Sequence, residues 1–190
     1  NLLRANPSAI NQRDLVYPGQ RLNVPAGGTI SKEVKGITST DYSKLNNKLA
    51  NTPLPRNGVG YTTYQPQSRQ YATQQTVQKL QDIAKSWNAK HPNSPIQIGN
   101  IGKKGGGLFK PHVSHQKGVD IDMRPFSKNG KQGPVSIYSK NYDAALTREF
   151  VRDVKAKFPN AAIGFQDKAL LDAGLTRNWG GHHDHLHIRF

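Results

Sequence analysis

The sequence predicts an α+β fold, in which a small antiparallel sheet carries the functional residues and two amphipathic helices flank it. Two observations indicate this class. Apolar residues recur at helical spacing over residues 76–89 and 142–158, so that each segment has one apolar face. Residues 119–123 and 185–188 alternate between polar and apolar side chains, as half-buried strands do.

The two helices are defined by their apolar positions and by their ends. The first presents Val77, Leu80, Ile83, Ala84 and Trp87, and is expected to stop before His91-Pro92. The second has its own apolar stripe, made of Ala145, Leu146, Phe150, Val151, Val154 and Phe158. Shorter patterns predict strands over residues 96–101 and 162–165, and a short helix over residues 168–173.

The chain divides by composition into three parts, which we expect to be residues 1–25, a linker over 26–52 and a main domain over 53–190. Residues 41–50 have the composition of a short helix, and residues 53–60 that of a loop. In the first part, the turn Pro18-Gly19 precedes the short alternating strand Arg21–Val24. Leu2 to Pro25 resembles the second half of a LysM module, which implies a remnant of a domain that binds N-acetylglucosamine-containing glycans. A terminal extension without this function fits the segment equally well.

Charge and cysteine content limit the classes of function. The chain has 27 Lys and Arg against 12 Asp and Glu, a net charge of +15, and no cysteine. Cysteine-ligated zinc and a disulfide framework are therefore excluded. The basic residues are scattered without interleaved aromatics, which indicates long-range attraction to an anionic surface and not specific nucleic-acid recognition. No apolar run approaches the roughly 18 residues that a transmembrane segment needs.

The C-terminal segment contains four of the seven histidines, in the order Trp179-Gly180-Gly181-His182-His183-Asp184-His185-Leu186-His187-Ile188-Arg189-Phe190. In a strand, residues two apart point to the same face, so His185 and His187 would share one face. Imidazole pairs of this kind suit zinc. Composition alone is also compatible with a weak metal-binding tract.

A second cluster precedes and includes the strand at residues 119–123. His112 and His115 lie in a loop that turns at Gly118, and Asp120 and Asp122 share one face of the strand. Burial of two carboxylates is costly unless they are paired or bind a metal. Solvent-facing aspartates are the common alternative, but that alternative leaves the two upstream histidines unexplained. Two histidines and one aspartate would give a catalytic zinc ion three protein ligands and an open position.

Both clusters match known motifs. Ser114-His115-x-x-Gly118-x-x-x-Asp122 resembles the His-to-Asp motif of the LAS metallopeptidases, and His185-x-His187 resembles their closing motif. Together with His112 and His182, the pattern is similar to the penicillin-insensitive murein endopeptidases of the MepA type, over about residues 53–190.

The resemblance implies one zinc ion per chain, bound by His115, Asp122 and His187. It also implies that His185 is the general base or stabilises the tetrahedral intermediate, and that His182 is a catalytic helper. His112 is expected to assist from beside the ligands. The implied reaction is attack of zinc-bound water on peptide cross-links of peptidoglycan, of the D-Ala to meso-diaminopimelate type.

Two carboxylates are expected to support the ligands and not to join them. A fourth protein ligand would close the site, so Asp120 is expected to lie behind the ligands. Related carboxypeptidases and dipeptidases use a glutamate three residues before the last ligand, where this chain has Asp184. Asp184 is expected to orient a histidine.

Alternatives with the same zinc site are a peptidoglycan carboxypeptidase, an amidase, and a catalytically silent zinc-bearing module that binds cell walls. A nucleic-acid binder driven by net charge is a further alternative, but it leaves the histidine clusters unexplained. The leading hypothesis predicts action on peptidoglycan in the periplasm, by a resident enzyme or by one secreted or delivered there. An antibacterial effector of this type would be expected to meet an immunity or inhibitor protein.

Overall fold

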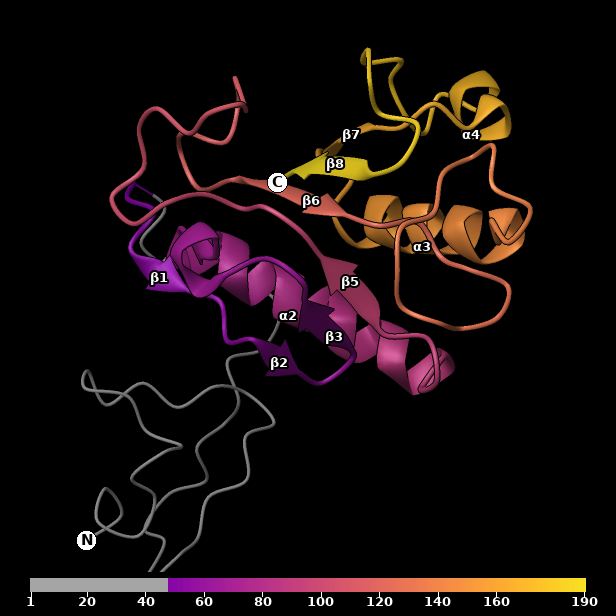
Figure 1. Cartoon of the computed structure of the whole chain (residues 1–190), viewed down its shortest axis with the longest axis horizontal. Helices are drawn as coiled ribbons and strands as arrows, with labels where there is room; N and C mark the ends of the chain where they lie inside the picture. Colours follow the sequence, from indigo (N-terminus) through magenta and orange to yellow (C-terminus); the bar gives the residue numbers. More distant parts are fainter. Residues whose placement is uncertain (1–47) are drawn as a thin grey trace, which may run out of the picture. The chain divides into compact units, whose positions relative to one another are not determined.

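The computed structural model describes residues 48–190, which combine helices and β-sheets in an α+β arrangement (Figure 1). The predicted fold class is therefore confirmed. The LysM-like segment, most of the expected linker and residues 41–47 of the expected short helix lie outside the described residues. The elements are β1 (Thr52–Pro53), β2 (Asn57–Gly58), β3 (Tyr61–Thr63), the 3-10 helix η2 (Gln67–Arg69), β4 (Tyr71–Ala72), α2 (Gln74–Lys90), β5 (Ile96–Ile98), β6 (Asp120–Met123), α3 (Ala144–Lys157), β7 (Ala162–Gly164), α4 (Lys168–Asp172) and β8 (Leu186–Arg189).

Helix α2 forms where the first apolar stripe predicted a helix, and it begins two residues earlier. Thr73 caps it, because its side-chain oxygen accepts a hydrogen bond from the Thr76 amide. The helix ends at Lys90 with His91 as its C-cap, and the following Pro92 cannot donate a helical hydrogen bond. Trp87 is fully buried and packs edge-on against Phe150 of α3, so the two helices share one core.

Helix α3 follows the second apolar stripe. Its N-cap is Asp143, whose carboxylate accepts from the Leu146 amide. Phe150, Val151 and Val154 are buried at helical spacing. Burial of this stripe against the sheet is the main source of the stability of the helix, since hydrophobic burial dominates folding.

The main sheet has six strands in the order β2-β3-β5-β6-β8-β7. Four of its pairings are antiparallel, and β3 pairs with β5 in parallel. The sheet is therefore mixed and larger than expected, because β2 and β3 extend it. The expectation that residues 53–60 form only loop was wrong, since Pro53 belongs to β1 and Asn57 and Gly58 form β2. Strands of two residues carry too little alternation to be recognised in a sequence.

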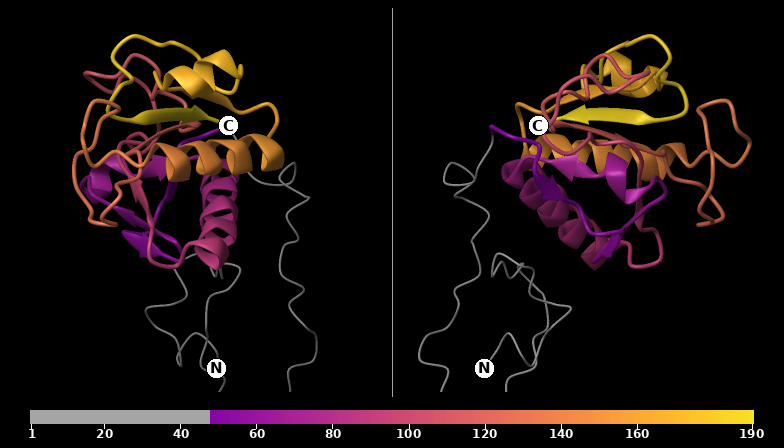
Figure 2. Two further views of the ribbon diagram at one scale, coloured as in Figure 1. Left: turned by 90° about the vertical axis from the view of Figure 1, so that its right-hand side faces the viewer. Right: turned by 60° about the vertical axis from the view of Figure 1, so that its left-hand side comes forward.

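The register of β6 and β8 separates a core face from a polar face. Ile121 lies opposite Ile188, and both are buried in the hydrophobic core. Asp122 lies opposite His187 in the same ladder, one residue along each strand, and these side chains point to the other face. In Figures 1 and 2, α3 lies on one side of β8, and the loop before β8 rises on the other side.

No helix within residues 48–190 is long and apolar enough to cross a membrane.

The loop before β6 needs glycine at position 118, where φ is +68°. A Cβ atom there would lie 2.6 Å from Ala50 Cβ and 3.0 Å from the Thr73 amide nitrogen. The tight approach at Gly118 fixes where the loop carrying His112 and His115 enters the sheet.

Candidate metal centre

The candidate site is built around the cross-strand pair of Asp122 on β6 and His187 on β8. Both side chains are buried, with 4% of each residue exposed. His187 Nδ1 lies 3.2 Å from Asp122 Oδ1. The strand register brings together residues that are 65 positions apart in the chain, and the sheet holds them in place.

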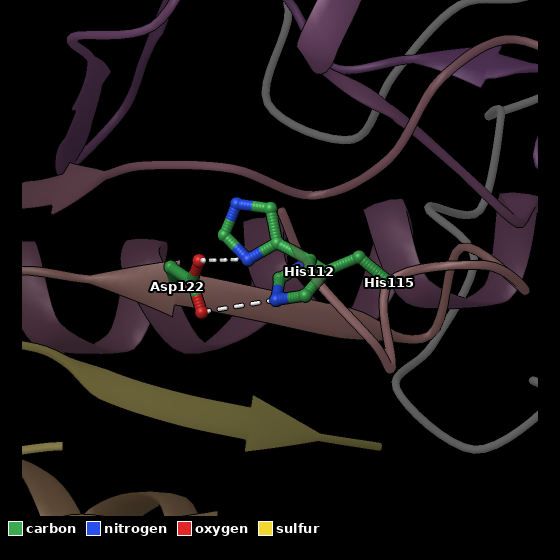
Figure 3. A group of neighbouring side chains, drawn as sticks. All are labelled: His112, His115 and Asp122. Atoms are coloured by element: carbon green, nitrogen blue, oxygen red, sulfur yellow. Dashed lines mark hydrogen bonds and ion pairs between the residues drawn. The ribbon is translucent and has the colours of Figure 1, made fainter. Parts of the chain in front are cut away.

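His115 reaches the same carboxylate from the loop before β6 (Figure 3). It is fully buried, and its Nε2 lies 3.1 Å from Asp122 Oδ1. Its Nδ1 lies 2.9 Å from the Ile101 carbonyl oxygen, which can only accept, so Nδ1 carries the proton. Nε2, which faces Asp122, is therefore the nitrogen that could bind a metal once its proton is displaced.

Asp120 holds the second ring nitrogen of His187, as the Ile101 carbonyl holds that of His115. Asp120 Oδ1 lies 2.9 Å from His187 Nε2 and 2.7 Å from Arg189 Nε. The carboxylate fixes Nε2–H of His187 and leaves Nδ1 facing Asp122. Asp120 is buried and lies against the side of His187 that faces away from Asp122, and its role in supporting a metal ligand stays a prediction.

These contacts fit a metal ion. Metal-binding histidines generally donate their second ring N–H to a carboxylate or a backbone carbonyl. His115 and His187 both do so, and both direct their remaining nitrogen at Asp122 Oδ1. Two imidazole nitrogens and one carboxylate are donors that suit zinc and other transition metals. The predicted ligands His115, Asp122 and His187 therefore lie together, and their role as ligands stays a prediction.

The electrostatics of the centre are those of a tightly coupled cluster. Burial alone would raise the pKa of Asp122, but hydrogen bonds with His115 and His187 hold that pKa well below its usual value. Burial alone would lower the pKa of His187, but hydrogen bonds with Asp120 and Asp122 raise it to about 9. Without a metal, the positive charge of His187 offsets the buried carboxylates. A bound cation would take over that function and displace the proton.

His112 approaches the second oxygen of the Asp122 carboxylate (Figure 3), on the outer side of the cluster, since it is more exposed than His115. Its Nδ1 is 3.7 Å from Asp122 Oδ2, and its ring stacks on Phe109 with centroids 5.4 Å apart. Ligand atoms of His112, His115 and Asp122 all lie within 4.8 Å of one another, so these three could also hold a metal ion. Burial lowers the pKa of His112, which favours the neutral ring.

His185 and Asp184 form a pair above the buried donors. His185 Nδ1 donates to Asp184 Oδ1 at 2.7 Å, and its Nε2 lies 3.9 Å from Asp122 Oδ1. His185 is partly exposed, whereas His115 and His187 are buried. Asp184 thus orients His185 with its free nitrogen toward the donors.

His182 is anchored next to His185, with ring centroids 4.6 Å apart. Its Nδ1 lies 2.9 Å from the Gly180 carbonyl and 3.2 Å from the Trp179 carbonyl, so Nδ1 carries the proton. Burial, and then the nearby His185, lower the pKa of His182. The neutral ring therefore presents a free Nε2. His183, to which the sequence assigned no role, instead lies beside Tyr138, with centroids 5.8 Å apart.

Trp179, beside the double glycine of the C-terminal segment, is on sequence grounds either a wall of a substrate groove or a core residue. It packs over Gly164, and its ring lies 5.4 Å from that of His187. Other residues near the cluster carry no signal in the sequence. Phe109 stacks on His112, and Tyr64 and Arg124 lie beside Asp122. Single aromatic or basic residues on separate loops have no periodic signal, because only the tertiary structure brings them together.

An α+β domain with a buried cluster of histidines and an aspartate is the class that the fold and the site define. The model of the family described as penicillin-insensitive murein endopeptidase matches residues 48–173, more than half of the chain. The chain belongs to this family. The matched residues include His112, His115, Asp120 and Asp122, whereas the C-terminal histidines at 182–187 lie beyond them.

Two curated relatives carry the same description. A penicillin-insensitive murein endopeptidase of Yersinia enterocolitica is 27% identical over 170 residues, which cover 72% of this chain and 60% of the relative. One of Klebsiella pneumoniae is 26% identical in an alignment that covers 90% of this chain and 70% of the relative. The chain thus spans about 60–70% of the length of the two relatives.

Proposed function

We propose that the chain is a zinc-dependent endopeptidase that hydrolyses peptide cross-links of bacterial peptidoglycan, with residues 53–190 as its catalytic domain. The observation that carries the proposal is the convergence of His115 Nε2 and His187 Nδ1 on Asp122, with the second N–H of each ring already engaged. Family membership supports murein as the substrate.

In this proposal, His115, Asp122 and His187 hold one zinc ion. The metal would supply Lewis acidity, which lowers the pKa of water to near neutrality and polarises a carbonyl. His187 is preferred to His112 as the third ligand, because Asp120 anchors its second nitrogen and its Nδ1 lies closer to the Asp122 carboxylate. His112 would assist from the outer side.

His185 is the proposed general base. Asp184 holds its Nδ1–H, so its Nε2 lone pair faces the donors and can take a proton from the attacking water. His182 is neutral near pH 7 because its pKa is lowered, and its Nε2 can accept or pass on a proton. One of the two histidines would protonate the leaving amine. The two histidines would thus do the proton transfers that related carboxypeptidases and dipeptidases assign to a glutamate, which this chain replaces with Asp184.

The setting follows from the same proposal. A net charge of +15 favours association with an anionic wall. The bond cleaved is of the D-Ala to meso-diaminopimelate type, in the periplasm of the cell that makes the enzyme or of a cell that receives it. If the chain is an antibacterial effector, a dedicated inhibitor protein is its expected partner.

Purified cross-linked muropeptide dimers test the proposal. The zinc-loaded protein is expected to convert dimers to monomers, and a chelator is expected to stop the conversion until zinc is restored. Release of a terminal D-Ala with the dimer intact would indicate a carboxypeptidase instead. Release of the stem peptide from the glycan would indicate an amidase, and no cleavage at all would favour a binding module.

A further inference from the structure

Tyr64 and Arg124 form a stacked pair next to Asp122. Arg124 is the second residue after Asp122 and continues its alternation, because its amide donates to the Gln97 carbonyl at 3.0 Å. Tyr64 directly follows β3, and its amide donates to the Ile98 carbonyl at 3.0 Å. The Arg124 guanidinium carbon lies 3.7 Å from the centroid of the Tyr64 ring. Both side chains are half-buried.

The Tyr64 hydroxyl lies at the edge of the metal cluster. A Cβ atom at Gly99 would be 2.4 Å from Tyr64 Oη and 3.3 Å from Asp122 Cβ, so the hydroxyl and Asp122 flank the same point. Glycine at this position is what admits the tyrosine. Burial raises the pKa of Tyr64 to about 12, so the phenol stays protonated and can donate a hydrogen bond at neutral pH.

Most donors of this pair are unused within residues 48–190, unlike those of comparable residues. Arg148 pairs with Asp167, Arg189 pairs with Asp120, and the Tyr142 hydroxyl donates to Asp167. Within residues 48–190, Arg124 has no carboxylate within ion-pair distance, and its guanidinium has one hydrogen bond, at 3.4 Å to Gln97 Oε1. The Tyr64 hydroxyl makes no hydrogen bond in that part of the chain.

A guanidinium fixed on an aromatic ring, with free N–H groups beside a phenol donor, is suited to a carboxylate. We propose that Arg124 and Tyr64 bind a carboxylate of the peptide substrate and so position the scissile amide at the metal cluster. The inference rests on the proposed function. The carboxylate that Arg124 and Tyr64 would bind is the one on the carbon that bears the leaving amine. In a cross-link through meso-diaminopimelate, the centre whose amine is acylated keeps its own free carboxylate, which is attached to the same carbon as that amine.

The test uses two muropeptide dimers, which have either the free carboxylate or its primary amide at that carbon. The wild-type protein is expected to cleave the amidated dimer with a kcat/KM about ten- to a hundredfold lower than that for the dimer with the free carboxylate. This factor corresponds to the free energy of a charge-assisted hydrogen bond. Arg124→Gln is expected to lower kcat/KM for the free carboxylate by a similar factor and to remove the preference. Tyr64→Phe is expected to reduce the preference in part. Arg152→Gln, which removes an exposed arginine of α3, serves as the control for net charge.

Zinc content and far-ultraviolet circular dichroism of each variant check that the cluster and the fold are retained. Calorimetry with a monomeric stem peptide that carries the free carboxylate gives a second readout, and Arg124→Gln is expected to weaken its binding about tenfold or more. If the wild type cleaves the dimers and Arg124→Gln keeps the full preference for the free carboxylate, the inference is overturned and the proposed function stands. If the wild type cleaves neither dimer but binds the peptide through Arg124, the proposed function fails alone. If neither cleavage nor Arg124-dependent binding occurs, both fail.

Discussion

Replacement of Asp120 by Asn tests how the sheet supports the metal centre. Asp120 is 1% exposed, and its Oδ1 lies 2.9 Å from His187 Nε2 and 2.7 Å from Arg189 Nε. Asn has nearly the same shape, so it removes a charge without opening a cavity. An amide oxygen is a weaker acceptor than a carboxylate, and His187 therefore loses the partner that fixes its N–H and raises its basicity.

We expect Asp120→Asn to raise the dissociation constant for zinc by about 10–100-fold, the usual effect of losing a carboxylate behind a metal-binding histidine. This corresponds to about 1.4–2.8 kcal/mol of binding free energy. Competition with a chromogenic zinc chelator at fixed pH measures the constant directly. The Arg189 side chain is about half exposed, so water can replace its lost ion pair at little cost.

Asp167→Asn is the matched control. Asp167 is also buried and also accepts from an arginine, Arg148, but it caps α4. This control is expected to lower stability and to leave the zinc affinity of the folded protein unchanged. An Asp120→Asn protein with the zinc affinity of the wild type would refute the assigned role of Asp120.

Three further predictions concern the surroundings of the cluster. Gly164→Ala would place a Cβ atom 2.2 Å from the Trp179 ring. We expect the displaced ring to lower kcat/KM for the muropeptide dimer about ten- to a hundredfold, with zinc retained. Gly180→Ala is the control, because its Cβ atom would have nothing within 4 Å, and it should match the wild type in the same assay. The pKa of His187 is raised from 6.5 to about 9 in the metal-free protein, so protonated His187 stabilises the fold fully below pH 6.5, and this stabilisation is lost as the pH rises through 9. The urea midpoint of chelator-treated protein should fall over this pH range. A flat profile would contradict the contacts of His187 with Asp120 and Asp122. His112→Ala should keep one zinc per chain and His187→Ala should not, as measured by elemental analysis; the reverse pattern would exchange their roles.

The sequence predicted the parts of the fold that have a long or strict period. The apolar stripes of α2 and α3 gave their positions to within two residues, and alternation located β6 and β8. The same alternation placed Asp120 and Asp122 on one face and His187 on the facing strand. What alternation could not give was the register, which makes Asp122 the neighbour of His187, because pairing depends on contacts remote in the chain.

The rest of the site depends on tertiary contacts that no local pattern reports. The Ile101 carbonyl that fixes the tautomer of His115 belongs to a loop after β5, and the Tyr64 ring reaches Asp122 only because position 99 is glycine. Short strands such as β2 were missed for a related reason, since two residues cannot show a period.

Whether the cluster is a catalytic zinc site is best decided by zinc stoichiometry measured together with lysis of purified sacculi, on the wild type, His115→Ala and His91→Ala. His91 provides the control because it lies at the end of α2 and contacts Glu149, away from the cluster. We expect one zinc per chain and lysis for the wild type and His91→Ala, and loss of both for His115→Ala. A wild-type protein without metal, or a His115→Ala protein that lyses sacculi as well as the wild type, would show that His115 does not hold a catalytic zinc ion.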